Sequence, residues 1–391
     1  MSASASILKA IDPRTTKLNL MLIAVPLTWY FAYIPNGSSY NVLSEEQLAT
    51  AAFFASMVAI MPLAFLMGRA TEEIALQTSD SLGGLLNATF GNAAELIIAL
   101  FAIIAAYEGI TSGTEVGLET SKMMVHLVQA SLIGSILGNL LLVMGLAFVW
   151  GGIHYEEQSF SQTQVSANGS LLLLAVMVLV VPTVFHSAVG GSEGASGVEN
   201  LSHIAALVLL VLYVLFLLFQ FKTHSHLFAT EGGHDEEPTT SKKDAMILLI
   251  LATIFVSWMA EILVGSVEKA AEKTGLPHLF IGVILLPLFG NAAEHFTAVS
   301  VAAKNKMDLS FAISIGSSTQ IAVFVAPLMV VIAWALGVPL TFEFGVLETV
   351  AVFMAVMIVN LIAADGKSNW LEGAMLLGAY AVLGAAFLFH P

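Results

Sequence analysis

The chain has 391 residues, of which 58% are apolar and 10% are charged, and its formal net charge is −15. Soluble proteins carry about a quarter charged residues, so this composition excludes an ordinary soluble domain and indicates a membrane protein. The acidic balance argues against a nucleic-acid-binding protein, which needs basic patches, and the absence of cysteine excludes disulfides and thiolate metal sites.

Apolar runs long enough to cross a bilayer, about 20 residues each, recur along the whole chain. Unpaired backbone groups are too costly in lipid, so we expect each run to form a helix. In chain order the runs predict eleven transmembrane helices: Leu18–Ile34, Ala49–Gly68, Gly83–Tyr107, Met123–Trp150, Val165–Phe185, Leu201–Phe221, Ala245–Val267, His278–Ala303, Leu309–Leu336, Val346–Ala364 and Trp370–His390. The predicted fold class is therefore an all-α polytopic membrane protein.

The first run follows Lys9, Arg14 and Lys17 and superficially looks like a signal peptide. No clear small-residue cleavage site follows it and ten more runs do, so we interpret it as a retained first helix. With a cytoplasmic N-terminus, ten of the 13 Lys and Arg residues fall on the cytoplasmic side, as the positive-inside rule requires. We expect a multi-pass protein of the cell membrane, or of a vacuolar or organellar membrane in a eukaryote, with its C-terminus outside the cytoplasm.

The sequence Phe-Gly-Asn-Ala-Ala-Glu occurs twice, at Phe90–Glu95 and at Phe289–Glu294. A Gly-Ser step in the following span repeats too, at Gly134-Ser135 and at Gly316-Ser317. Without the first helix, five spans precede and five follow a hydrophilic stretch, and an odd number of spans forces the two units into opposite orientations. This pattern predicts an inverted repeat, with a substrate site between the units near the middle of the bilayer.

We therefore expect an extra N-terminal helix in residues 1–40, a first five-helix repeat in 41–221 and a second, inverted repeat in 244–391. Residues 222–243 form a cytoplasmic linker with acidic and histidine residues. The linker is either a solvated tether between the repeats or a cation sensor. The glycine-rich segment 189–197 is expected to be a loop on the opposite side of the membrane.

Glu95 and Glu294 fall near the middle of their expected spans. A carboxylate is costly there unless it is paired, protonated or facing a polar cavity. Oxygen ligands suit hard cations such as Ca2+, which takes about six to eight. Neutral oxygens near the two carboxylates are expected from Asn92, Asn291, Ser135, Ser317, Asn139 and Gln320. The alternative is a structural pair of protonated glutamates that bond between helices.

Two carboxylates ~5 Å apart at an effective dielectric constant of ~20 repel by about 3 kcal/mol. Desolvation adds to this preference for the protonated form. An empty site therefore takes up protons, and a divalent cation competes with them for the same oxygens. Charge alone suggests two protons per Ca2+.

Four further residues each have two candidate roles. His295 is either a proton relay or a packing residue. Glu72, Glu73 and Glu261 lie toward the ends of their spans, where they are either sites at which cations or protons enter the protein or ordinary interfacial charges.

The paired motifs resemble the two α-repeats of the cation/proton exchangers of the Ca2+/cation antiporter superfamily. The resemblance also includes the segments Ala88-Thr89-Phe90, Glu294-His295 and Gly316-Ser317-Ser318-Thr319-Gln320, and the span plan agrees along essentially the whole chain. It implies Ca2+/H+ exchange by alternating access, with Glu95 and Glu294 binding Ca2+ and protons in turn, and no cofactor beyond the transported ions.

Three other functions remain open in the sequence. Na+/Ca2+ exchangers of the superfamily favour a Ser/Thr-Pro-Glu motif and an acidic residue in the later Gly-Ser helix. Asn-Ala-Ala-Glu and Gln320 stand here instead, which argues against Na+, although a Na+- or K+-coupled Ca2+ exchanger remains an alternative. A Ca2+-permeable channel is a second. An enzyme finds little support because no zinc-protease or paired catalytic motif is present. The oligomeric state is open.

Overall fold

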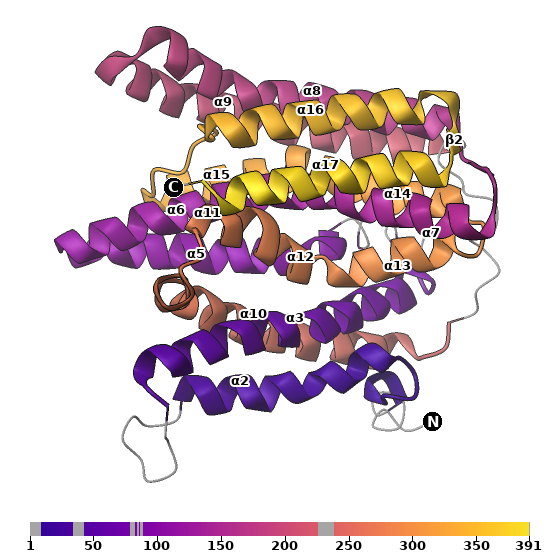
Figure 1. The fold of residues 1–391 in the computed structure, drawn as a ribbon, viewed down its shortest axis with the longest axis horizontal. Coiled ribbons are helices and arrows are strands. Elements are labelled where there is room, and N and C mark those ends of the chain that lie inside the picture. The colour runs from indigo at the N-terminus through magenta and orange to yellow at the C-terminus, as the bar shows by residue number, and fades with distance from the viewer. Residues whose placement is uncertain are drawn as a thin grey trace.

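The computed structural model describes residues 9–33, 43–78, 83, 86, 89–225 and 238–390. They form a bundle of long helices that run along one common axis (Figure 1). The elements are η1 Lys17–Ile23, α2 Ala24–Tyr33, α3 Glu45–Ala75, α5 Ala93–Ser112, α6 Glu115–Leu137, η2 Gly138–Val143, α7 Met144–His154, β1 Gln158–Ser159, α8 Gln162–Val189, α9 Gly191–Leu218, η3 Phe219–Thr223, α10 Lys242–Thr274, α11 His278–Phe280, η5 Ile281–Leu285, α12 Leu286–Gly290, α13 Ala292–Ala302, α14 Met307–Gln320, η6 Ile321–Val325, α15 Ala326–Leu336, α16 Val346–Ile362, η7 Ala363–Asp365, β2 Lys367–Ser368 and α17 Trp370–Leu388. Of the η segments, η1 and η7 are 3-10 helices and the others are π-helices.

The all-α fold class is confirmed. Within the described ranges nine helices are long and apolar enough to cross a membrane, and the bent segment from α11 to α13 would make ten. The expected first helix is present as η1 and α2, which have 7 and 10 residues. Together they are shorter than each of the nine membrane-spanning helices. The count of eleven therefore stays a prediction, as does the division into two inverted repeats.

Helix ends follow their local sequence. Ser44 and Gln47 form a capping box at the start of α3. The turn between α8 and α9 depends on Gly190 and Gly191, which adopt positive φ values of 68° and 62° that side chains strongly disfavour. The prediction of a loop over residues 189–197 is wrong. The two glycines make the turn so tight that α9 already begins at Gly191.

The helices lie in three groups across the bundle (Figure 1). α3 packs along α10 at one edge, with α2 against α3, while α8, α9 and α16 lie at the opposite edge. Between them lie α5, α6, α7, α12, α13, α14, α15 and α17. We call the end of the bundle that carries β1, β2 and Thr223 the linker end.

α6 and η5 cross very closely in the middle group. A Cβ atom on Gly134 would overlap the backbone carbonyl of Val283, and a Cβ atom on Gly282 would lie 2.5 Å from the Cβ atom of Ala130. Small residues permit this approach because each helix has a glycine where the other helix comes nearest.

We expect Gly134→Ala to lower the apparent Tm of the purified protein in detergent, measured by intrinsic fluorescence. The added methyl meets backbone that cannot yield, and overpacking of this kind costs about 1–3 kcal/mol. Gly265→Ala on α10 is the matched control, since nothing lies within 4 Å of its added Cβ atom. It should leave the Tm unchanged or raise it, because alanine favours helix. Equal melting of the two variants would contradict a close crossing at Gly134.

Candidate functional site

An asparagine interrupts the helix in each copy of the six-residue motif. Asn92 is the N-cap of α5 with φ −98° and ψ 21°, and Asn291 has φ −94° and ψ 7° where the chain bends by 59° between α12 and α13. Neither asparagine side chain caps its helix. The expected spans Gly83–Tyr107 and His278–Ala303 are therefore both interrupted within the motif. Asparagine is unfavourable inside a helix, because its side chain can hydrogen-bond to nearby backbone groups in non-helical conformations. Each break directly follows the glycine of the motif.

Both carboxylates therefore lie at helix starts instead of in the middle of helices. Glu95 is in the first turn of α5 and Glu294 is in the first turn of α13. The first N–H groups of a helix have no partner within it and carry partial positive charge. Each break thus places a favourable electrostatic environment beside a buried carboxylate.

The two motifs face each other. A Cβ atom built on Gly91 would lie 3.1 Å from Oε1 of Glu294, and one built on Gly290 would lie 3.6 Å from Oε1 of Glu95. Each carboxylate therefore reaches across to the backbone of the other motif. The structure brings together, in one site, two glutamates that are far apart in the sequence.

Some of the polar side chains around the two carboxylates are hydrogen-bonded to one another. Ser317 Oγ donates to Oδ1 of Asn92 over 2.7 Å, and Asn92 Nδ2 donates to Oε1 of Gln320 over 2.8 Å. Ser317 also lies beside Glu294. Asn92, Ser317, Gln320 and Glu294 therefore form one connected group between α5, α13 and α14.

The other polar side chains around the two carboxylates have no such bonds within the described residues. Ser135 Oγ, Asn139 Nδ2 and both side-chain polar atoms of Asn291 are buried without a hydrogen-bond partner among the described residues, as are both Glu95 oxygens. α6, which carries Ser135, packs against α12, and η2, which carries Asn139, packs against α13. Each unsatisfied buried polar group costs about 1–3 kcal/mol. So many in one region indicate a site built for a polar ligand.

The donor set suits a cation bound by oxygens. The described residues contain no cluster of three or more His, Asp or Glu side chains that could hold a metal ion. Binding would therefore rest on two carboxylates together with the neutral oxygens of Asn291 and Ser135. This mixture suits a hard cation better than it suits a transition metal, which prefers imidazole or thiolate ligands.

The structure places the four remaining candidates elsewhere. His295 is buried on α13 with its Nε2 atom unpartnered among the described residues, and one helix step turns it about 100° from Glu294. Glu73 accepts hydrogen bonds from the backbone N–H groups of Thr239 and Thr240, which anchors the approach to α10. Glu72 and Glu261 are exposed on α3 and α10. Their roles in ion entry stay predictions.

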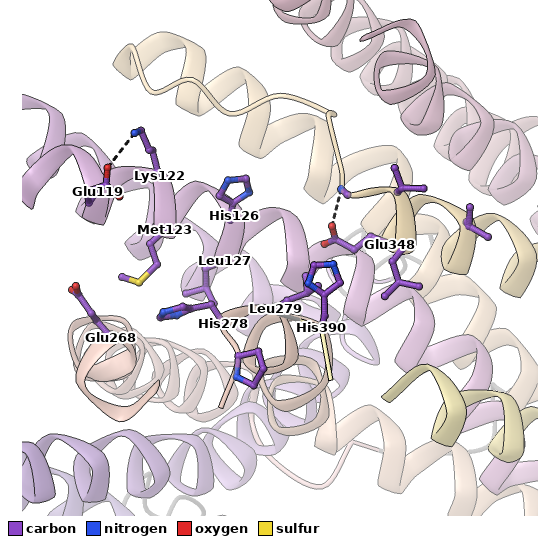
Figure 2. A pocket seen from close by; sticks show the side chains of 15 residues that line it. Glu119, Lys122, Met123, His126, Leu127, Glu268, His278, Leu279, Glu348 and His390 are labelled. Atoms are coloured by element: carbon purple, nitrogen blue, oxygen red, sulfur yellow. Dashed lines mark hydrogen bonds and ion pairs between the residues drawn. The ribbon is translucent and has the colours of Figure 1, made fainter. Parts of the chain in front are cut away.

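A large cavity lies at the end opposite the linker end and has a volume of about 1270 Å³ (Figure 2). None of the eight expected cation ligands lines it. Its titratable side chains are instead Glu119, Lys122, His126, Glu268, His278, Glu348 and His390. The close crossing of α6 and η5 lies deeper along the same helices. We call this cavity the vestibule.

The π-helical segments beside the site have no counterpart among the sequence-based predictions. α6 passes into η2 three residues after Ser135, and α14 passes into η6 directly after Gln320. Asn139 lies inside η2 itself. A π-turn frees backbone carbonyls and is frequent at functional sites. No residue type in either segment signals it, although both follow the Gly-Ser steps that mark the repeat.

Comparisons with known proteins agree on one family. Residues 48–222 and 245–389 match the family described as sodium/calcium exchanger protein. A Ca(2+)/H(+) antiporter of Aphanothece halophytica is 46% identical over 87% of this chain and 90% of its own length. A vacuolar calcium ion transporter of Schizosaccharomyces pombe is 37% identical over 95% of this chain and 85% of its own.

Solved structures show the same likeness. The structure of native YfkE has a TM-score of 0.75 and 36% identity, and the match covers 95% of this chain and 100% of that one. The crystal structure of the H+/Ca2+ exchanger CAX has a TM-score of 0.69 at 16% identity, over 95% of this chain and 91% of its own, and bears on the fold alone.

Proposed function

The chain belongs to the sodium/calcium exchanger protein family, in its cation/proton exchanger group, and from this premise we propose that it exchanges Ca2+ for H+ across a membrane. It is a multi-pass transporter and not an enzyme. One observation carries the proposal: two carboxylates at helix starts face each other across paired glycines, and both Glu95 oxygens lack another partner among the described residues.

Charge balance couples the two ions at this site. Two ionised carboxylates with one Ca2+ have no net charge, and two protonated carboxyls have none either. A half-loaded site would hold an uncompensated charge in the protein interior, which is costly. The two neutral states can therefore cross between the two sides of the membrane, while the charged states stay where they are. Ca2+ arrival releases two protons, and Ca2+ departure allows two to bind.

Alternating access has support in the asymmetry of the polar groups. The Asn92 group is bonded, while its counterparts Asn291, Ser135 and Asn139 are not, within the described part of the chain. We propose that the two sets exchange these states when the site changes sides. The close crossing of α6 and η5 below the vestibule favours such gating over an open pore. The excess of Lys and Arg predicts that the linker end faces the cytoplasm.

The test is Ca2+ flux into sealed proteoliposomes under an imposed pH gradient, with and without Na+ and K+. We expect the proton gradient alone to drive Ca2+ uphill. Ca2+ movement that needs a Na+ or K+ gradient would show that Na+ or K+, and not H+, is the counter-ion. Downhill Ca2+ flow that does not saturate would indicate a channel.

We expect exchange to be electrically silent, because both transported states of the site are neutral. The initial rate at a fixed pH gradient should be the same when a K+ gradient with valinomycin sets the membrane potential to zero or to a negative value. A rate that differs between the two potentials would contradict two protons per Ca2+. His295, beside Glu294, would then be the first candidate for a third proton, which His295→Gln would test.

A further inference from the structure

A second cavity, of about 150 Å³, lies between α8, α9 and α14. Its wall contains Gln164, Asn168, Tyr213, Gln220, Gly316 and Gln320. No acidic or basic side chain among the described residues lines it. One buried water needs roughly 10–15 Å³, so the cavity has room for a cluster of waters or for a hydrated ion.

The polar side chains lie on matching helix faces. Gln164 and Asn168 are one turn apart on α8, and Tyr213 and Gln220 are two turns apart along α9 and η3. Elsewhere these two helices expose apolar side chains such as Val181. Amides are costly in lipid, so their gathering in one cavity separates them from the lipid-facing surface.

The cavity extends from the linker end toward mid-membrane. It follows α14 and η6 from Ala312 to Val323, a length of about 16 Å at 1.5 Å per residue. Half of a hydrocarbon core is about 15 Å. The outer part lies beside Gln164 and Gln220, near the ends of α8 and η3, and the inner part lies beside Gln320.

A buried hydroxyl points to a ligand in this cavity. Tyr213 is 6% exposed, it lines the cavity, and its Oη atom is buried without a hydrogen-bond partner among the described residues. Its ring stacks on Phe324 at 4.7 Å between centroids, which holds it in place. A buried hydroxyl in this condition needs a partner from the contents of the cavity.

Gln320 joins this cavity to the glutamate pair. Its side chain lines the cavity, and its Oε1 atom accepts the hydrogen bond from Asn92. Asn92 in turn accepts from Ser317, which lies beside Glu294. This hydrogen-bonded chain therefore connects the inner end of the cavity to a carboxylate of the site.

We propose that the cavity is a second cation site, which holds a hydrated divalent cation on its way between the linker end and Glu294. The proposal rests on the proposed Ca2+/H+ exchange. Amide and hydroxyl oxygens accept hydrogen bonds from the water shell of the ion without removing it. Because no carboxylate of the described chain lines the cavity, the cation waits there without displacing a proton, and competition begins only when the Asn92–Gln320 bond opens toward Glu294.

The absence of cysteine from the chain gives a direct test. Asn168→Cys introduces the sole thiol into the cavity of the full-length protein in nanodiscs. We expect a small cationic methanethiosulfonate reagent to label it, and millimolar Ca2+ to slow the labelling severalfold. Gln162→Cys is the matched control on the same helix, because Gln162 is exposed outside the cavity, and Ca2+ should not change its labelling rate.

The same measurement is repeated with Glu95→Gln and Glu294→Gln also present. Protection of Asn168→Cys by Ca2+ should persist, because the second site does not need the carboxylates. Protection that disappears in this background would place the cation at the glutamate pair only, and would overturn the second site while leaving the exchange function intact. A thiol that does not react, or that Ca2+ does not protect in either background, would also overturn it. Failure of pH-driven flux in the unmodified protein would instead overturn the exchange function.

A filling substitution adds a transport readout. Nothing lies within 4 Å of a Cβ atom added to Gly316, so Gly316→Leu fills the cavity without displacing a neighbour at that atom. We expect the KM for Ca2+ on the linker side to rise severalfold while kcat changes less. Gly378→Leu on α17, which also has open space at Cβ, should leave both unchanged. An unaltered KM in correctly folded Gly316→Leu protein would contradict the proposed route.

Discussion

Replacing either Glu95 or Glu294 by glutamine is expected to abolish Ca2+/H+ exchange while the protein remains folded and inserted. Glutamine keeps the shape of the side chain but can neither release a proton nor balance half of the Ca2+ charge. One remaining carboxylate would leave the Ca2+-loaded site with a net positive charge in the protein interior. We expect a loss of at least ~100-fold in exchange rate, which corresponds to about 2.8 kcal/mol.

The stability of these variants should not fall. Each substitution removes a buried ionisable group that lies near a like charge, and a buried charge without a partner is destabilising. Thermal melting and size-exclusion profiles in detergent should therefore match the unmodified protein or show a higher Tm. Glu115→Gln, an exposed residue in the first turn of α6, is the control and should exchange normally. Wild-type exchange by either site variant would remove the paired-carboxylate mechanism.

The two motif glycines should differ in their tolerance of alanine. The added Cβ atom at Gly91 would lie 3.1 Å from Oε1 of Glu294, whereas the one at Gly290 would lie 3.6 Å from Oε1 of Glu95. The first distance forces the carboxylate to move, and the second is an ordinary contact. We expect Gly91→Ala to raise the KM for Ca2+ by ~10-fold, or about 1.4 kcal/mol, and Gly290→Ala to have a clearly smaller effect.

Initial rates of Ca2+ uptake over a range of Ca2+ concentrations, at one fixed pH gradient, measure this difference. The two glycines serve as controls for each other, since both stand one residue before a helix break in the same six-residue motif. If both variants behaved alike, the approach of Glu294 to the Gly91 backbone would not matter for binding. If Gly290→Ala raised the KM more than Gly91→Ala, the approach of Glu95 to Gly290 would be the tighter one, and this prediction would be wrong.

Much of the site can be named from the sequence alone, because two identical motifs stand out against an apolar background. Glu95, Asn92, Glu294 and Ser317 indeed meet between the motif helices and α14. Hydropathy by itself predicts a span through each motif, and the structure interrupts each span at the asparagine of the motif. Hydropathy averages over many residues, and it does not register a backbone break at one asparagine. The break nevertheless decides the chemistry, since it places each carboxylate in the first turn of a helix.

The sequence by itself determined the membrane class, most of the spans, the family and the carboxylate pair. Lipid imposes these features locally, because every span must be apolar and helical on its own and any charge within it stands out. Only the tertiary structure decided which polar atoms meet. The bond between Asn92 and Gln320 joins residues 228 positions apart. The Tyr213 hydroxyl, which has no hydrogen-bond partner among the described residues, is buried only because three helices pack together around it. Such contacts depend on how the spans dock, and the apolar surfaces that drive insertion into lipid carry little information about docking.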